Sequence, residues 1–227
     1  MLQQSGGEAL NRELTILQTD LIFLGGLVEN AIIKSLNSLS SRNLDENQEV
    51  IKDDDQIDKK RYDIEDHCMK IVREFAPVAG DLRRVFSSLL CSQELERMGD
   101  YAVGISQISI KMGPGPTFKK LVDIPKIADL SINMMKKSLE AVTENDRKLS
   151  LKIANSVFPD DDKVDELNSS IQKEMIDLMS KESKPIGIRN GTYLIWISHN
   201  LERIADRSTN IAEDTIFLVT GSSRELK

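Results

Sequence analysis

Four pairs of acidic residues, each with a spacing of four, are the part of this sequence best suited to chemistry. Residues four apart lie one turn above each other on the same face of a helix. Carboxylate oxygens are the hard ligands that Mg²⁺, Ca²⁺, Mn²⁺ and iron ions prefer. A single pair of this kind is usually a solvated helix face, whereas its repetition favours metal binding. The pairs are Asp54/Asp58, Glu96/Asp100, Asp161/Asp165 and Glu202/Asp206.

The positions of these pairs relative to the turns of the chain place them at matching heights. In a helical hairpin, two residues equidistant from the turn lie at the same level. The first two pairs are centred on positions 56 and 98, whose midpoint is Pro77, and the last two on positions 163 and 204, whose midpoint falls within Glu182–Pro185. Each pair therefore lies about 30 Å from its turn, at about 1.5 Å per residue.

The spacing predicts the level of each acid pair but not the direction in which its face points. Four carboxylates at one level repel each other unless a cation or a basic side chain lies among them. Arg97 and Arg203 directly follow the two glutamates and can pair with a carboxylate across the interface, and Asp53–Asp55 can form a capping turn. A bound cation, an arginine pair and a solvated acidic face all remain open at this point.

The hydrophobic pattern predicts helices almost throughout the chain. Apolar residues recur at steps of three and four from Cys91 to Ile105 and from Leu194 to Ile211, as on the buried face of bundle helices. Hydrophobic residues make up 40% of the chain and aromatic residues 4%, which favours packed aliphatic helices over a β-sandwich. Pro159 predicts a kink or irregular turn within the fifth helix. The predicted helices cover residues 8–41, 45–75, 79–112, 117–144, 147–181 and 187–220.

The two halves of the chain resemble each other. The segments "LERMGD" and "LERIAD" are offset by 106 residues, as are Arg83 and Arg189, and "DDDQIDKK" and "DDDKVDEL" are offset by 107. Between the halves, "MGPGPT" contains two glycines and two prolines and is the strongest stop in the chain. We therefore predict an all-α protein of two tandem, internally repeated three-helix bundles, with domains 1–113 and 114–227 hinged near Gly113–Pro116.

Composition and motif content exclude several classes of function. The formal net charge is −7 and no strong Lys/Arg cluster is present, so we expect no nucleic-acid partner. Cys68 and Cys91 lack a metal-binding spacing and suit a reducing compartment. No secretory signal is evident, and no apolar stretch approaches the roughly 20 residues of a membrane span. We expect a cytoplasmic protein that is not membrane-embedded and, without a P-loop, dinucleotide motif or catalytic triad, not an enzyme.

The motifs resemble a known family. The segments "ELERMGDYAVGI" and "NLERIADRSTNIAED" resemble the paired signatures of the PhoU family of bacterial phosphate transport and phosphate signalling, and "FAPVAGDLRRV" resembles the opening of its third helix. The resemblance covers nearly the whole chain. It implies two similar three-helix bundles side by side and metal ions, in some members iron clusters, held at the surface by paired E/D-x-x-x-D motifs. These motifs fall on the eight acids named above, and we expect them to bind iron, manganese, magnesium or zinc.

The resemblance also implies a regulatory function. It implies an adaptor that restrains phosphate-starvation signalling through contacts with the phosphate transporter's ATPase subunit and a phosphate-responsive sensor kinase, and we expect a homodimer. Two departures distinguish the halves. The segment "NIAE" ends the second motif at Glu213, but the first half has Gly104 and Gln107 in the matching places, and Ala205 stands where a glycine is common. We therefore expect fewer oxygen donors near the first metal site than near the second.

Two other functions remain open. A carboxylate-bridged helical-bundle metalloprotein with oxidoreductase-like activity would need an open coordination position and usually histidine ligands. Neither histidine stands three residues after a glutamate, which argues against that function. A phosphotransfer bundle would use His67 as its phosphoacceptor, whereas His199, one turn before Glu202, suits a role beside a metal site.

Overall fold

The protein is all-α, as the sequence predicts. The computed structural model describes residues 2–113 and 123–221, and these residues form helices and no strand. Every predicted helix that falls within the described residues is present, and the fifth is divided in two. The helices are α1 (Leu2–Ser41), α2 (Leu44–Phe75), α3 (Ala79–Met112), α4 (Asp123–Thr143), α5 (Arg147–Asn155), α6 (Phe158–Ser180) and α7 (Pro185–Thr220).

Local signals explain where α2 begins and ends. The Asn43 side chain accepts hydrogen bonds from the backbone N–H groups of Asp45 and Glu46 at 3.2 and 3.4 Å, which caps the first turn. The helix ends at Ala76, which has a left-handed φ of 44° and donates its N–H to the Val72 carbonyl. Pro77 follows and disfavours the α region at the residue before it. The hairpin of α2 and α3 therefore turns at the proline from which the heights of the acid pairs were counted.

The predicted irregularity at Pro159 divides the fifth helix into α5 and α6. Asp146 caps α5 by accepting two backbone N–H groups at 2.9 Å, and α5 ends at Asn155. Pro159 lies in the first turn of α6, where its missing N–H leaves no intrahelical bond unmade. The predicted start of the fourth helix at residue 117 lies outside the described residues. Of the predicted hinge, Gly113–Pro116, only Gly113 is among the described residues. The predicted domain boundary between residues 113 and 114 stays a prediction.

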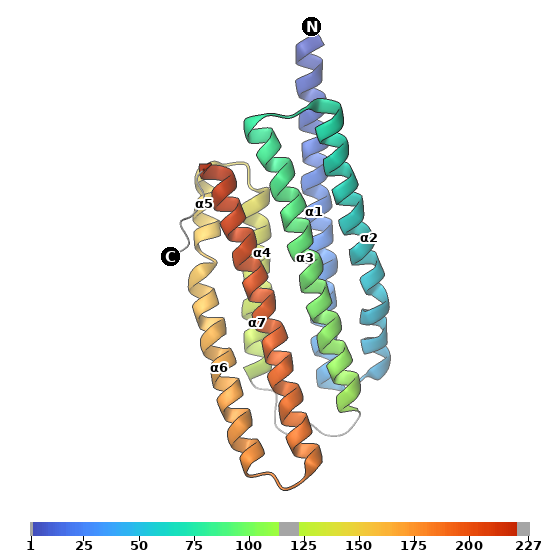
Figure 1. Cartoon of the computed structure of the whole chain (residues 1–227), viewed down its shortest axis with the longest axis vertical. Helices are drawn as coiled ribbons and strands as arrows, with labels where there is room; N and C mark the ends of the chain where they lie inside the picture. The colour runs from blue at the N-terminus through green and yellow to red at the C-terminus, as the bar shows by residue number, and fades with distance from the viewer. Residues whose placement is uncertain (1, 114–122, 222–227) are drawn as a thin grey trace.

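Helices α3 and α7 form the centre of the molecule and run antiparallel (Figure 1). Helices α1 and α2 pack with α3, and α4, α5 and α6 pack with α7. Two contacts related by the repeat join the central helices. Glu94 of α3 accepts a hydrogen bond from Asn210 of α7 at 3.3 Å, and Gly104 of α3 lies against the Asn200 side chain of α7. The two halves therefore share one core.

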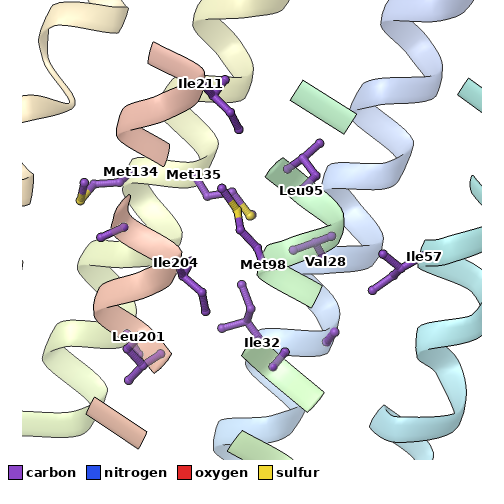
Figure 2. Close-up of a cluster of buried hydrophobic side chains, with 14 of the residues drawn as sticks. Val28, Ile32, Ile57, Leu95, Met98, Met134, Met135, Leu201, Ile204 and Ile211 are labelled. Atoms are coloured by element: carbon purple, nitrogen blue, oxygen red, sulfur yellow. The ribbon is translucent and has the colours of Figure 1, made fainter. Parts of the chain in front are cut away.

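Aliphatic side chains and methionines fill that core (Figure 2). Met98 of α3 and Met135 of α4 point toward each other between the halves, with Ile204 of α7 beside them. Burial of each such side chain contributes about 1.5–3 kcal/mol relative to leaving it exposed. The seams read from the sequence are confirmed, because each of the following side chains is at most 2% exposed: Cys91, Leu95, Met98, Ala102, Ile105, Leu194, Ile197, Leu201, Ile204, Ser208 and Ile211.

Helix α1 combines a packed face with an apolar outer face. Within Gly7–Ser41, an 18-residue window has a mean hydropathy of 1.5, as in a membrane span, and 33% of that window is buried. The buried part includes Leu17, Leu24 and Val28 in the core, whereas Phe23 lies on the outer face. The core accounts for the leucines of this helix, so α1 is not a clear membrane span.

Candidate metal centres

The first acid cluster lies between α2 and α3. It consists of Asp54 and Asp58 on α2 with Glu96 and Asp100 on α3. Gly99 precedes Asp100, and a Cβ at Gly99 would stand 3.5 Å from the Asp54 Oδ1 and 3.1 Å from the Ile57 Cδ1. The Asp54 carboxylate therefore lies against α3 beside Asp100, and the tight contact at Gly99 is with Ile57.

The carboxylates of the first cluster affect one another across the two helices. Burial, followed in order by the charges of Asp58, Asp100 and Glu96, raises the pKa of Asp54 to about 6. Burial is also the main cause of the raised pKa of Glu96 and of Asp100, followed by neighbouring acids of the cluster. In the structure, the acid faces of α2 and α3 thus point toward a common space.

The second acid cluster repeats this arrangement between α6 and α7. It consists of Asp161 and Asp165 on α6 with Glu202 and Asp206 on α7. Burial raises the pKa of Asp161 to about 6, with Asp165 and Asp206 as the next causes. Burial followed by Asp206 raises the pKa of both Asp165 and Glu202, and His199 and Arg203 partly offset the shift of Glu202. Equivalent residues, Asp54 and Asp161, therefore carry the largest shift in each cluster.

Two oxygens of the second cluster lack hydrogen-bond partners. Asp161 Oδ1 and Glu202 Oε2 are buried and have no partner among the described residues. The Nδ1 of His199 lies 3.1 Å from that glutamate oxygen, but the angle makes no hydrogen bond. Buried oxygens without partners are unfavourable, and a cation is the kind of group that satisfies them.

Among the described residues, the arginines beside the glutamates, Arg97 and Arg203, form no ion pair across the interface, and Arg203 pairs along its own helix. Arg203 Nη1 lies 3.0 Å from Asp206 Oδ2, one turn along α7, and its Nε lies 3.9 Å from Glu202 Oε2. Near the first cluster, Arg61 is paired with Glu65 at 2.7 Å on α2. Among the described residues, no arginine therefore bridges the two helices of either cluster.

Lysines neutralise a neighbouring aspartate in each half, a feature that the sequence analysis missed. Lys34 of α1 lies 3.2 Å from Asp53, and Lys137 of α4 lies 2.6 Å from Asp160, which also contacts Lys163 at 2.7 Å. The hydrogen bond from Lys137 is the largest cause of the lowered pKa of Asp160. Adjacent helical residues point about 100° apart, so the first aspartate of each "DDD" run faces these lysines while the second faces the cluster.

The clusters offer the right donors for a cation without forming a finished ligand set. Among the described residues, no three His, Cys, Asp or Glu side chains are close enough together to hold a metal ion as they stand. Each cluster nevertheless brings carboxylates from two helices together, and the second has two unpartnered buried oxygens. Hard oxygen donors of this kind fit a divalent or ferric cation, and side-chain rotations would have to draw them inward.

Two residues expected to add oxygen donors beside the second cluster, Asn210 and Glu213, interact with acids outside it. The Asn210 amide nitrogen donates to Glu94 Oε2 on α3 at 3.3 Å, and Arg207 reaches the same oxygen at 3.3 Å. Glu213 contributes to the raised pKa of Asp214, after burial and Glu94. The richer oxygen environment of the second site therefore stays a prediction.

The histidines lie in different surroundings. His67 Nε2 lies 2.8 Å from Glu13 Oε2, its Nδ1 lies 3.8 Å from Asp20, and its side chain is 13% exposed. This contact ties α2 to α1 and is the largest cause of the lowered pKa of Glu13. Carboxylates on both sides of His67 disfavour a phosphoryl donor. With His67 in this ion pair and His199 beside one glutamate, no observation favours a histidine-ligated oxidoreductase centre or a phosphotransfer site.

Comparison with known proteins adds a consistent set of similarities. The sequence matches the PhoU domain over residues 21–109 and again over residues 124–215. The phosphate-specific transport system accessory protein PhoU homolog of Clostridium acetobutylicum is 32% identical over 216 residues, which cover 94% of this chain and 95% of that protein. The homolog of the same name from Aquifex aeolicus is 32% identical over 212 residues, 93% of each chain.

Two solved structures share the whole architecture. The phosphate transport system regulatory protein PhoU from Streptococcus pneumoniae superposes with a TM-score of 0.84 at 28% identity, over 96% of this chain and all of that chain. PhoU from Pseudomonas aeruginosa superposes with a TM-score of 0.85 at 30% identity, over 93% of this chain and 99% of that chain. Both the sequence matches and the structural matches include the two halves.

Proposed function

The chain belongs to the PhoU family, and from this premise we propose that it is a regulatory adaptor of phosphate uptake whose two acid clusters bind metal ions. The family membership makes it an accessory protein of phosphate transport, and the family is not one of known enzymes. One observation carries the metal proposal. Equivalent clusters in both halves each hold four carboxylates, one of which has its pKa raised to about 6.

A cation at each cluster would act on the hairpin that carries it. Asp54 and Asp58 would bind it from α2, and Glu96 and Asp100 from α3, with the four equivalent acids doing so in the second half. The chemistry that the cation supplies is neutralisation of the repulsion among these carboxylates. The eight acids are each at least partly exposed, so we expect the fold to persist without metal, unlike that of a zinc finger.

The partners follow from the transport system to which the relatives belong. The relatives are called phosphate-specific transport system accessory proteins, which supports contact with that system. We take the ATPase subunit of the transporter and the phosphate-responsive sensor kinase as the two contacts, with the adaptor restraining the kinase when phosphate is plentiful. A homodimer in the cytoplasm is part of the same proposal.

Gene deletion tests the regulatory proposal. We expect deletion to leave phosphate-starvation genes expressed at high phosphate, and the wild-type chain supplied in trans to restore repression. The measurement is reporter expression across a series of phosphate concentrations. Expression that is unchanged by the deletion at every concentration would show that the assignment is wrong. Metal analysis of protein purified without an affinity tag tests metal binding separately, so the two parts can fail independently.

A further inference from the structure

An apolar pocket lies at the end of the molecule where α3 begins and α7 ends. The cavity has a volume of about 180 Å³ and lies between Leu82, Phe86 and Leu90 of α3 and Phe217 and Leu218 of α7, and the carboxylate of Asp214 also lines it. Phe86 is 60% exposed and Phe217 46% exposed. Large apolar side chains gathered around a cavity at the surface are typical of binding sites.

A basic pocket adjoins the apolar pocket. Its volume is about 230 Å³, and three arginines line it: Arg83, Arg84 and Arg147. Arg83 and Leu218 line both pockets, so the two cavities share a wall. Two carboxylates, Asp81 and Glu144, also line the basic pocket, which leaves it with one net positive charge in a chain of net charge −7.

Two of the three arginines have no anionic partner within the described part of the chain. Arg147 donates to the Val219 carbonyl at the end of α7. The Arg83 Nε is buried without a hydrogen-bond partner, and neither Arg83 nor Arg84 forms an ion pair with a described residue. A guanidinium that is partly withdrawn from water favours a carboxylate or another oxyanion as its partner.

The internal repeat shows that the fold does not require these side chains. At the offset of 106 residues, Phe86 corresponds to Thr192, Phe217 to Lys111 and Arg84 to Asn190. The opposite end of the α3–α7 pair therefore has the same backbone plan without the two phenylalanines or the second arginine. It also exposes apolar side chains, with Trp196 50% exposed. These three side chains, which line the paired pockets, therefore distinguish this end of the molecule from the other.

We propose that the two pockets together dock a segment of a partner protein in which a large apolar side chain is followed by acidic residues. The apolar pocket is close in size to a cavity of about 150 Å³ that binds benzene in another protein, so it suits one large side chain. The carboxylates that follow would reach Arg83 and Arg84. Asp81 and Glu144 oppose a long polyanion, which limits the number of acidic residues. This site needs no metal and is separate from the acid clusters.

A defined peptide tests the pairing of apolar and acidic contacts. The probe is acetyl-Phe-Glu-Glu-amide, titrated into the full ¹⁵N-labelled chain and followed by amide chemical shifts. We expect shifts confined to the residues around Leu82–Leu90 and Asp214–Gly221. Matched peptides with Ala in place of Phe, or Gln in place of both Glu residues, should bind at least about fivefold more weakly.

Substitutions in the chain complete the test. F86A and the double change R83Q/R84Q should each weaken the Phe-Glu-Glu peptide about fivefold or more, and R189Q at the equivalent position should leave its affinity unchanged. Thermal unfolding of each variant verifies that it is folded. Equal binding of all three peptides, or shifts elsewhere on the surface, would overturn the proposal. So would a change of oligomeric state in F86A by sedimentation, because a second copy of the chain would then cover the pocket.

Discussion

The two acid clusters stand at equivalent places in the repeat, yet their surroundings differ. In the first, Gly99 of α3 faces Ile57 of α2 at a distance that leaves little room for a side chain, and Asp54 lies beside it. In the second, the equivalent residue is the buried Ala205, and Arg203 pairs with Asp206 at 3.0 Å. The repeated backbone therefore sets the position of each cluster, whereas the local side chains decide how its charge is balanced.

This comparison separates what attracts a cation from what competes with it. The second cluster has buried oxygens without partners on Asp161 and Glu202, which favour a cation, but Arg203 already neutralises part of its charge. Among the described residues, the first cluster has no buried carboxylate oxygen without a partner, and the charges of Arg61 and Arg97 offset part of the raised pKa of Glu96. We expect the unpartnered oxygens to outweigh an arginine whose side chain is 42% exposed, because exposed ion pairs contribute only about 0–1 kcal/mol.

The largest expected effect is the loss of one metal site. Changing Glu202 and Asp206 together to Ala should weaken the tighter of two binding events by more than about 100-fold, because direct ligands matter more than the outer groups whose loss costs 10–100-fold. The same change at Glu96 and Asp100 should remove the weaker event. The measurement is calorimetric titration with Mn²⁺ and Fe²⁺, with Asn at both positions as the control that keeps side-chain shape. Unchanged stoichiometry and affinity in both variants would show that the acids are only solvated faces.

The next largest effect concerns the lysines. Asp160 is 7% exposed and Asp53 lies nearer to solvent, so K137M should reduce the free energy of unfolding by about 2 kcal/mol. We expect less than the 3–5 kcal/mol typical of a broken buried pair because Lys163 still reaches Asp160. K34M should change stability by less than about 0.5 kcal/mol. Urea unfolding measures both, and equal effects would remove this difference between the halves.

A smaller effect should follow from exchanging the small residues of the two clusters. G99A places a Cβ 3.1 and 3.2 Å from atoms of the buried Ile57, and we expect a net loss of about 1 kcal/mol after the gain in helix propensity. A205G should also lose about 1 kcal/mol, there through helix propensity. The two are distinguished by metal titration, since only G99A moves a carboxylate of the first cluster. Stabilisation by G99A would show that α2 can shift without strain.

The smallest effect concerns pH. The pKa of about 6 of Asp54 and of Asp161 lies above the ordinary value of 3.8, so the folded protein binds these protons more tightly than the unfolded chain. The metal-free protein should therefore gain stability as pH falls from 7 to 5, by about 1 kcal/mol once solvent screening is allowed for. Below pH 4 the lowered pKa values of Glu13 and Asp160 act in the opposite direction.

Variants that lack the acids of one cluster test whether both clusters contribute to this pH dependence. Removing the acids of either cluster should reduce the pH effect by about half, because Asp54 and Asp161 have similar pKa values. Thermal unfolding at pH 7, 6 and 5 in the presence of a chelator is the measurement. A stability that falls steadily from pH 7 to 5 would contradict the assigned burial of these carboxyl groups.

The sequence predicted the fold correctly where a local pattern, such as helical spacing or a proline, determines the structure. Apolar steps of three and four identified the buried faces of the helices, and Pro77 located the turn between α2 and α3. Counting residues predicted the heights of the acid pairs, but rotation about the helix axis depends on packing, so only the structure shows Asp54 turned toward α3. The contacts of Lys34 and Lys137 with the adjacent aspartates were missed for the same reason.

The pockets beside Phe86 could not be predicted from the sequence for another reason. The walls of the apolar pocket come from residues 82–90 and 214–218, more than 120 positions apart, and no local pattern links them. The repeat even predicts the opposite, because the correspondence of Arg83 with Arg189 suggests that both ends of the molecule are alike. Differences between repeat copies, here Phe86 against Thr192, are the signal that could have found the site.

The antiparallel contact of α3 with α7 also bears on how the chain assembles and how such a repeat is maintained. Because α7 is a copy of α3, an α3 from another molecule could take its place during synthesis, giving a swapped pair of first halves. In such a pair Glu94 would lie opposite the counterparts of Arg207 and Asn210, which are Tyr101 and Gly104. It would lose both of its hydrogen bonds there. Divergence at these few positions therefore gives each half a preference for its own sister rather than for a neighbouring chain.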